Sequence, residues 1–530
     1  MTTVVYYLLI VLMSSLSLLW FANLILIQSD NISRITSGSI GGYLSLSEAE
    51  EFLHELTHVH SQLITRYAIG KSLEGREMYA YKITAVFDSN IEVPKLLMTS
   101  LMHAREPLSL SASLFIISQL VEEYVAQVTD VEYLLRTREL YVIPMVNPDG
   151  YSRLSTTLGF RKNTRDTCPS DLVNSGVDLN RNFAFDWKEV ANKCSEDYSG
   201  TGPFSEPETQ NIRDFSTAKK FKSAVNFHAY GNILTIPYNG GSGEKIVNEQ
   251  HMKFYKDIQA AWKFQAFGPS RETLNYTTHG ESDDWFYDEL GVLSMSPELG
   301  PQSAGFRPTS EEVRKVLFDI YPKIKLWMMR AGGSQIDAVR IIPHDQEKMG
   351  IEFENRGLES FNNATIVVRD HGLCNACNED ANCRTAMDGQ VRVFNRVNVS
   401  ANPLGGTGIL LISSCPKSVM HERESLDVCV LQASRNCRCF KPLLNGSWTS
   451  IQVDQISNSL FNKELCEIGG LARFVDALPF RVSRDQDSFS LVSSLLLLIF
   501  VGVSIIQTAR MFVAGDKTLI QQEPIIRDLP

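Results

Sequence analysis

The sequence predicts an α/β fold for residues 40–332, with a mixed, mostly parallel twisted sheet covered by helices on both faces. Two observations carry this prediction. Short apolar runs such as 95–101 have the length of buried strands, whereas longer stretches such as 110–124 are apolar with a helical period. The two kinds of segment alternate along the chain, which favours parallel strands joined by helices.

The same patterns assign the individual elements. We expect strands over 95–101, 140–146, 223–227 and 292–296, and helices over 48–64, 110–124 and 311–329. Gly332 and Gly333 follow the last helical pattern, so we place a domain boundary there.

A different composition begins after this boundary. Eight of the ten cysteines fall between Cys374 and Cys466, and short alternating runs there are separated by clusters of Asn, Gly and Asp. We therefore expect a small disulfide-rich β-sandwich over 337–480, whose cysteine connectivity the sequence does not define. The pair Cys374-x-x-Cys377 could instead belong to a zinc ribbon, but a cysteine-dense lumenal segment favours disulfides.

Two long apolar runs frame the chain. The first, within 1–29, predicts a signal peptide or N-terminal anchor, and the second predicts a transmembrane helix over 489–514 with a cytoplasmic tail over 515–530. The chain also has five Asn-x-Ser/Thr sites and an even number of cysteines. These features predict a single-pass membrane glycoprotein of the secretory pathway whose body is lumenal or extracellular.

Composition narrows the possible partners. Apolar residues make up 44% of the chain and both charge signs are well represented, as is typical of a globular protein. The formal net charge is -11 and no long basic run opposes it, so we exclude nucleic acid as a partner.

A candidate metal site follows two of the predicted strands. His103 and Glu106 stand three residues apart just after the strand over 95–101, and His228 ends the strand over 223–227. The carboxyl ends of parallel strands meet at one edge of a sheet, where α/β proteins place their sites. Two histidines and one carboxylate suit catalytic zinc, although each motif alone fits a surface pair or a core histidine better.

The full order of motifs resembles the zinc metallocarboxypeptidases typified by pancreatic carboxypeptidases A and B. The resemblance runs over residues 43–330 and is carried by the segments 103–106, 160–163, 176–183, 226–230, Tyr276 and 296–300. It implies a carboxypeptidase-like fold and a specific role for each matching residue.

The implied roles fall into three groups. One Zn²⁺ would be bound by His103, Glu106 and His228, and Asp178 would orient His103. Glu298 would be the catalytic glutamate and Arg161 would stabilise the oxyanion. The substrate's terminal carboxylate would be bound by Asn180, Arg181 and Tyr276, with further substrate contacts from Arg105 and Tyr230. The resemblance also implies a disulfide between Cys168 and Cys194.

These residue types suit the hydrolysis of a C-terminal peptide bond. Zinc lowers the pKa of water towards about 7 and polarises the scissile carbonyl. Glu298 can take the proton of the water and deliver it to the leaving amine. The planar fork of Arg181 matches a carboxylate, so we expect the C-termini of peptides and proteins as substrates.

The side chain that is removed depends on one further position. The resemblance places Asp283 at the base of the specificity pocket, where an Asp favours Lys and Arg. Two observations weaken this interpretation: Asp283 or Asp284 could be a solvated loop charge, and Arg271 stands nearby in the sequence. We expect a preference for basic C-terminal residues.

Two departures from the family matter. Only a short stretch separates the apolar leader from the match, so we expect no inhibitory pro-segment. The glycosylation site at Asn275 adjoins Tyr276, and a glycan there would crowd the site, so we expect it to be unused.

Two alternative functions stay open. The first is a catalytically inactive ectodomain that serves as a binding or adhesion module, although the complete set of matching residues argues against it. The second is a related zinc hydrolase that acts on amides or cell-wall peptides. A substrate with a blocked carboxyl terminus distinguishes the second alternative, because a true carboxypeptidase should fail on it.

Overall fold

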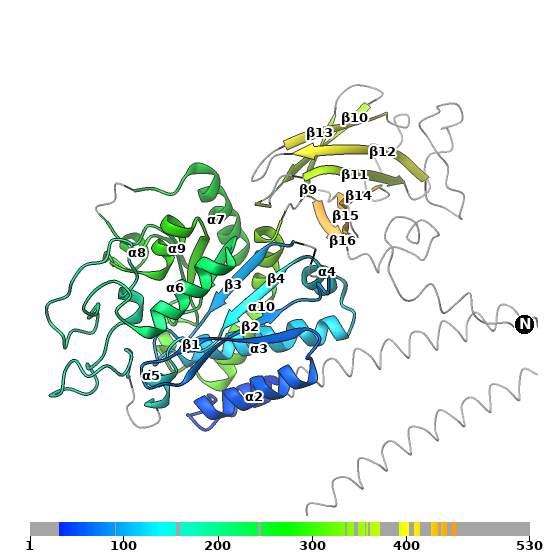
Figure 1. The fold of residues 1–530 in the computed structure, drawn as a ribbon. Coiled ribbons are helices and arrows are strands. Elements are labelled where there is room, and N and C mark those ends of the chain that lie inside the picture. Colours follow the sequence, from blue (N-terminus) through cyan, green and yellow to red (C-terminus); the bar gives the residue numbers. More distant parts are fainter. Residues whose placement is uncertain are drawn as a thin grey trace, which may run out of the picture. The chain divides into compact units, whose positions relative to one another are not determined.

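The computed structural model describes residues 31–333 except 89, 91, 155–158 and 242–244. Between 336 and 451 it describes the backbone of a set of strands and the short turn at 357–358 (Figure 1). The predicted leader at 1–29, the predicted span at 489–514 and the predicted tail at 515–530 lie outside the described residues.

The first part of the chain is built on one mixed sheet with the strand order β1-β2-β4-β3-β5-β8-β6-β7. The strands are β1 (Ile64–Lys71), β2 (Glu77–Ile83), β3 (Lys95–Thr99), β4 (Glu139–Ile143), β5 (Ser223–Asn226), β6 (Ile233–Thr235), β7 (Ala266–Gly268) and β8 (Leu293–Glu298). The central strands β4, β3, β5 and β8 are parallel, whereas β1, β2 and β6 pair antiparallel at the two sides. The predicted mixed α/β sheet is confirmed.

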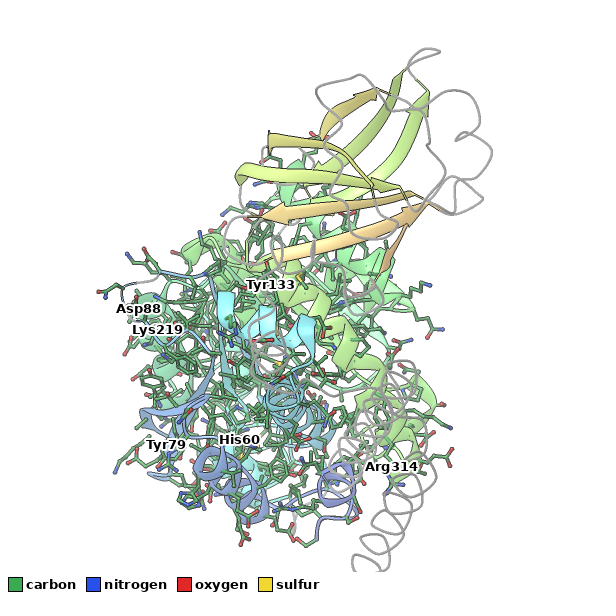
Figure 2. The ribbon with its side chains drawn as sticks, turned by 90° about the vertical axis from the view of Figure 1, so that its right-hand side faces the viewer. His60, Tyr79, Asp88, Tyr133, Lys219 and Arg314 are labelled. Atoms are coloured by element: carbon green, nitrogen blue, oxygen red, sulfur yellow. A yellow bond between two sulfur atoms is a disulfide. The ribbon has the colours of Figure 1, made fainter. Side chains whose placement is uncertain are left out.

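Alternate residues of the central strands enter two separate cores. Leu96 and Met98 of β3 lie in one hydrophobic cluster, and Leu97 between them lies in the other. This two-residue period is what a strand buried on both faces produces. Helices therefore cover both faces, and Lys219 and Arg314 lie on opposite sides of the domain in Figure 2.

The helices divide between these two cores. The first core packs against α2 (Leu46–Val59), α3 (Pro107–Val125), α4 (Thr129–Thr137), α7 (Glu249–Trp262) and α10 (Ser310–Ala331). The second packs against α6 (Pro207–Lys219) and α9 (Ser282–Leu290). The short helices α5 (Pro148–Ser152) and α8 (Ser270–Thr273) lie in connections.

The expected helix over 48–64 is wrong at its carboxyl end. A capping box between Ser45 and Glu48 starts α2, the helix ends at Val59, and β1 already begins at Ile64. The sequence pattern missed β1 because most of its side chains are not buried, so the strand has no regular apolar alternation. The other assigned elements are present, with ends shifted by a few residues.

The helix α3 is long and apolar enough to span a membrane, and it is the one such helix in the described part of the chain. It is almost wholly buried within the protein and packs against α10 and α4. Its apolar character is therefore that of a core helix.

The backbone described beyond residue 336 forms two antiparallel sheets. One has the order β13-β10-β9 and the other the order β12-β11-β14-β15-β16. The strands are β9 (Ile336–Pro343), β10 (Lys348–Asn355), β11 (Phe361–Asp370), β12 (Arg392–Ala401), β13 (Thr407–Ser413), β14 (Leu426–Gln432), β15 (Asn436–Pro442) and β16 (Trp448–Ile451). The expected disulfides of this region, and the domain boundaries, stay predictions.

Candidate active site

The first two candidate metal ligands stand where β3 passes into α3. Pro107 opens the helix, where its missing N–H is not needed. Glu106 occupies the N-cap position, but its carboxylate makes no capping bond to the helix and faces the preceding residues instead: its Oε1 lies 2.8 Å from Nδ1 of His103. The start of α3 thus presents a carboxylate and an imidazole to the carboxyl edge of the sheet.

His228 reaches the same point from the neighbouring strand β5. Its backbone N–H donates to the carbonyl of Pro297 at 3.0 Å, and its own carbonyl accepts from Leu299 at 2.9 Å. These bonds form a parallel bridge between His228 and Glu298. Strand pairing therefore places the third candidate ligand beside the candidate base.

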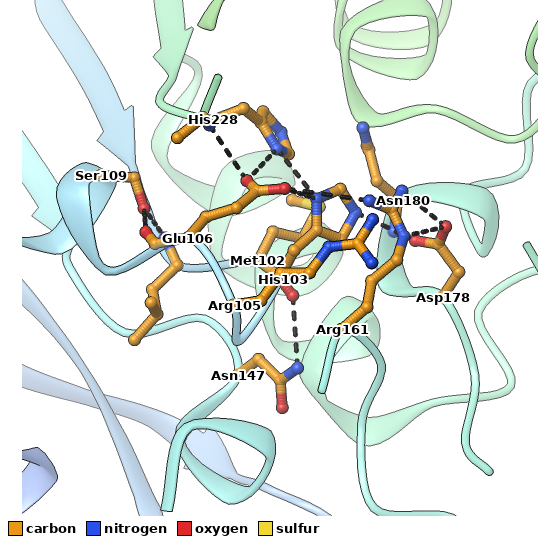
Figure 3. Close-up of polar contacts among 12 residues, drawn as sticks. Met102, His103, Arg105, Glu106, Ser109, Asn147, Arg161, Asp178, Asn180 and His228 are labelled. Atoms are coloured by element: carbon orange, nitrogen blue, oxygen red, sulfur yellow. Dashed lines mark hydrogen bonds and ion pairs between the residues drawn. The ribbon is translucent and has the colours of Figure 1, made fainter. Parts of the chain in front are cut away.

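The three side chains converge on one point (Figure 3). Nδ1 of His228 lies 3.1 Å from Oε2 of Glu106 and 3.1 Å from Nδ1 of His103. Within the described ranges, this is the one group of His, Cys, Asp or Glu side chains that could hold a metal ion. Ligand atoms of a tetrahedral zinc with bonds of about 2 Å lie roughly 3.3 Å apart, so the residues present fit this ion.

Charges within this buried group compensate one another. Burial raises the pKa of Glu106, but the charges and hydrogen bonds of His103 and His228 outweigh burial and lower it overall. Burial lowers the pKa of His228, but Glu106 raises it overall to about 9. The group therefore favours a positive charge between its side chains, whether a proton or a metal ion supplies it.

Asp178 supports this group from the side. Its Oδ1 lies 3.1 Å from Nε2 of His103, and its Oδ2 accepts from Nε and Nη2 of Arg161 at 3.0 and 2.8 Å. Asp178 is fully buried, yet Arg161 and His103 hold its pKa well below the usual range against the effect of burial. Asp178 thus fixes the orientation of both neighbours, while Nη1 of Arg161 lies 3.8 Å from Glu106.

Asn180, Arg181 and Tyr276, the residues expected to bind the terminal carboxylate of the substrate, form the candidate carboxylate clamp. The first two lie directly after Asp178, in the 3₁₀ turn Leu179–Arg181, which we call the clamp turn. Oδ1 of Asn180 accepts from the backbone N–H of Ser282 at 3.0 Å, which ties this turn to the start of α9. Tyr276 is half exposed on the loop before α9. Partial burial raises the pKa of its phenol, and the charge of Arg181 acts on this pKa in the opposite direction, so Arg181 lies within electrostatic reach of Tyr276.

Glu298, the candidate base, ends β8 and is half-buried. Burial is the main cause that raises its pKa to about 8, and the nearby charge of Glu106 raises it further, whereas His228 and Arg161 lower it. A carboxyl group whose pKa lies near neutrality can both accept and deliver a proton.

Asp283 lies in the first turn of α9 and is buried, as is Asp284. The alternative that either residue is a solvated loop charge is therefore wrong. The amide of Asn226 donates to the Asp283 carboxylate, and Asn226 in turn accepts from Thr99 at 2.8 Å. Burial is the main cause that raises the pKa of Asp283 to about 7.

Comparison with known proteins identifies the family of this chain. The family model described as zinc carboxypeptidase matches residues 49–319, about half of the chain. The chain belongs to the zinc carboxypeptidase family. Members of this family are metallocarboxypeptidases, hydrolases that use a catalytic Zn²⁺.

Relatives of this zinc carboxypeptidase include both insect and mammalian proteins. A zinc carboxypeptidase of Simulium vittatum is 29% identical over 290 residues, which cover 51% of this chain and 92% of the relative. Carboxypeptidase B of Homo sapiens is 28% identical and is covered over 74% of its length, against 57% of this chain. The crystal structure of carboxypeptidase A from Helicoverpa armigera is 25% identical, with a TM-score of 0.48, and covers 54% of this chain and 73% of its own.

Arg105 and Tyr230 lie at the edge of the site in this zinc carboxypeptidase. The guanidinium of Arg105 stacks 4.4 Å over the ring of Phe306 and forms an ion pair with Glu196. The ring of Tyr230 packs edge-on against the same Phe306 ring, with 4.7 Å between the two ring centroids. Phe306 therefore joins the two predicted contact residues, and no sequence pattern singled it out.

A disulfide joins Cys168 to Cys194, as the resemblance implied. The loop that it closes contains the turn Leu179–Arg181. Arg271 lies on α8 and donates to the backbone carbonyl of Tyr238 at 3.1 Å. The ion-pair partner that the structure gives Arg271 is Glu272, not Asp283.

The sequence analysis missed Glu281. This residue precedes α9 and its Oε1 accepts from Nη1 of Arg181 at 2.9 Å. Both side chains of the pair are only 11% exposed. An acidic residue two positions before Asp283 was the available signal, but no periodic pattern marks such a position as buried.

Proposed function

We propose that this chain is an active zinc-dependent carboxypeptidase that removes single residues from the carboxyl ends of peptides and proteins, with a preference for basic residues. One observation carries the proposal: the metal-ligand group, the half-buried carboxyl group of Glu298 at the end of β8 and the turn that holds Arg181 lie together at one edge of the sheet. A binding module would not need this combination.

In the proposed reaction, His103, Glu106 and His228 bind Zn²⁺, and Asp178 keeps His103 oriented. When bound, the ion supplies a Lewis acid that polarises the scissile carbonyl and lowers the pKa of water. Arg181, Asn180 and Tyr276 hold the terminal carboxylate, which fixes the last peptide bond beside the ion.

Glu298 then takes a proton from the attacking water and delivers it to the leaving amine, and its pKa of about 8 suits both steps. Arg161 stabilises the negative charge that develops on the carbonyl oxygen, an effect worth roughly 3 kcal/mol in such sites. Arg105 and Tyr230 contact residues further along the substrate.

Asp283 is proposed to select a cationic C-terminal side chain. Its carboxyl group is buried at the start of α9, close enough to His228 for that charge to affect its pKa. A buried carboxylate that has no ion-pair partner in the described part of the chain gains more from a Lys or Arg side chain than from an apolar one.

We also propose that the protein acts on the lumenal or extracellular side of a membrane. The disulfide Cys168–Cys194 supports this placement, because such bonds persist in oxidising compartments. The apolar run over 489–514 supports anchoring by a single span.

The test uses the purified full-length chain in detergent, with and without a zinc chelator. Blocked dipeptides ending in Arg, Lys, Phe, Leu or Glu are supplied, and release of the last residue is followed. We expect chelator-sensitive release that is fastest for Arg and Lys, and no release from the same dipeptides with an amidated carboxyl terminus. Failure to release any residue from folded, zinc-loaded protein would favour the inactive binding module.

A further inference from the structure

The ion pair between Glu281 and Arg181 occupies the clamp itself. Nη1 of Arg181 donates to the carboxylate of Glu281 at 2.9 Å and to the backbone carbonyl of Asn180 at 2.8 Å. A substrate carboxylate that approaches Arg181 therefore meets a guanidinium already bound to a carboxylate of the protein. The two anions compete for one cation.

Glu281 is surrounded by other acidic groups. Burial is the main cause that raises the pKa of Asp284 to about 8, and the charge of Glu281 is the next cause. The charge of Glu281 also contributes to the raised pKa values of Asp283 and Glu298, for which burial is again the main cause. Arg181 is the cation that the structure pairs with Glu281 in this acidic region of the described site.

Displacing Glu281 from Arg181 has a different cost for different substrates. A C-terminal residue with an apolar side chain brings an anion for Arg181 but leaves Glu281 almost buried, unpaired and next to Asp283. A C-terminal Lys or Arg brings the same anion together with a cation. Leaving a buried charge unpaired is strongly unfavourable, whereas exchanging its partner is not.

We propose that Glu281 is a specificity-determining residue that exchanges ion-pair partners with the substrate: the terminal carboxylate replaces Glu281 on Arg181, and the cationic side chain of the last residue replaces Arg181 on Glu281. This inference rests on the proposed function. It assigns to Glu281 the rejection of neutral C-terminal residues, a role distinct from the attraction of basic ones by Asp283.

The experiment compares the full-length wild-type protein with Glu281→Gln, which keeps the size of the side chain and removes its charge. Blocked dipeptides ending in Arg, Lys, Phe or Leu give kcat and KM for each. We expect Glu281→Gln to raise kcat/KM for Phe and Leu ends about 10- to 100-fold, mainly through KM. The values for Arg and Lys ends should change by only a few fold, so that the basic preference narrows.

Two further variants serve as controls. Glu289→Gln removes one charge from an exposed position of α9, the helix that follows Glu281, and should leave the ratio of kcat/KM for basic to neutral substrates unchanged. Glu281→Asp retains the charge and should retain most of the preference. Calorimetric binding of N-acetyl-arginine and N-acetyl-phenylalanine gives a second readout that needs no turnover: Glu281→Gln should narrow the gap between the two affinities.

The outcomes separate this inference from the proposed function. An equal loss of kcat/KM for all four substrates in Glu281→Gln would mean that Glu281 only positions Arg181, and an unchanged ratio would mean that it selects nothing. Either result overturns the inference while leaving the peptidase in place. Wild-type protein that releases no residue at all overturns the proposed function and the inference together.

Discussion

Two groups of charged side chains share this site and handle charge in opposite ways. Around His103, His228 and Arg161, the carboxylates of Glu106 and Asp178 face cationic partners that lower their pKa values despite full burial. Around Glu281, by contrast, carboxyl groups outnumber its paired cation Arg181, and burial raises the pKa values of Asp283, Asp284 and Glu298.

The difference indicates what each group is built to bind. Compensated carboxylates stay ionised and oriented, as the ligands of a resident metal ion must be. In the second region burial outweighs the nearby cations, so its carboxyl groups stay short of positive charge until a cation arrives with the substrate. The first group is therefore suited to a permanent cation and the second to a transient one.

Removing a ligand from the first group should have the largest effect. We expect His228→Ala to abolish both zinc binding and peptidase activity, because two ligands cannot hold the ion in this geometry. Zinc content is measured by atomic emission and activity with a dipeptide ending in Arg. His54→Ala, on the exposed face of α2, is the control and should behave as wild type. A His228→Ala protein with full zinc and full activity would contradict the assigned ligand set.

Glu298→Gln should have the next largest effect. This variant separates the role of the first group, which is to bind zinc, from the proton transfer that Glu298 carries out. Zinc should stay bound, because Glu298 is not one of the three ligands, while kcat falls by about 10²–10⁴ because proton transfer is lost. Parallel measurement of zinc content and kcat checks both parts. If the variant lost its zinc as well, Glu298 would belong to the metal-binding group and the comparison would fail.

The sequence analysis named residues of both groups, but the convergence of the first follows from the fold, whereas Glu281 of the second group was missed. His103, Glu106 and His228 follow strands that are apolar enough to recognise, so their convergence could be expected from the fold. Glu281 and Phe306 lie in connections, where neither burial nor partners follow a period. The edge strand β1 was missed for a related reason, because its side chains are mostly unburied.

Asp178→Asn tests how far the metal-binding region depends on its support. The amide cannot match the carboxylate as an acceptor for both His103 and Arg161, so we expect zinc affinity to fall about 10- to 100-fold. Competition with a chromogenic chelator gives the affinity. Asp166→Asn, which changes an exposed carboxylate in the loop before the Leu179–Arg181 turn, should leave the zinc affinity unchanged. An unaltered affinity in Asp178→Asn would mean that His103 is oriented without this hydrogen bond.

The smallest expected effect is the pH dependence of selectivity, and it comes from the second region alone. Burial raises the pKa of Asp283 to about 7, so the group is largely neutral below that pH and ionised above it. The ratio of kcat/KM for an Arg-ended to a Phe-ended dipeptide should therefore rise several fold between pH 6 and pH 8, estimated from the one-proton titration of this group. Using the ratio cancels the titration of Glu298, which affects both substrates. Asp283→Asn should give a ratio that is low and independent of pH, and a wild-type ratio that falls with pH would remove Asp283 from the role of selector.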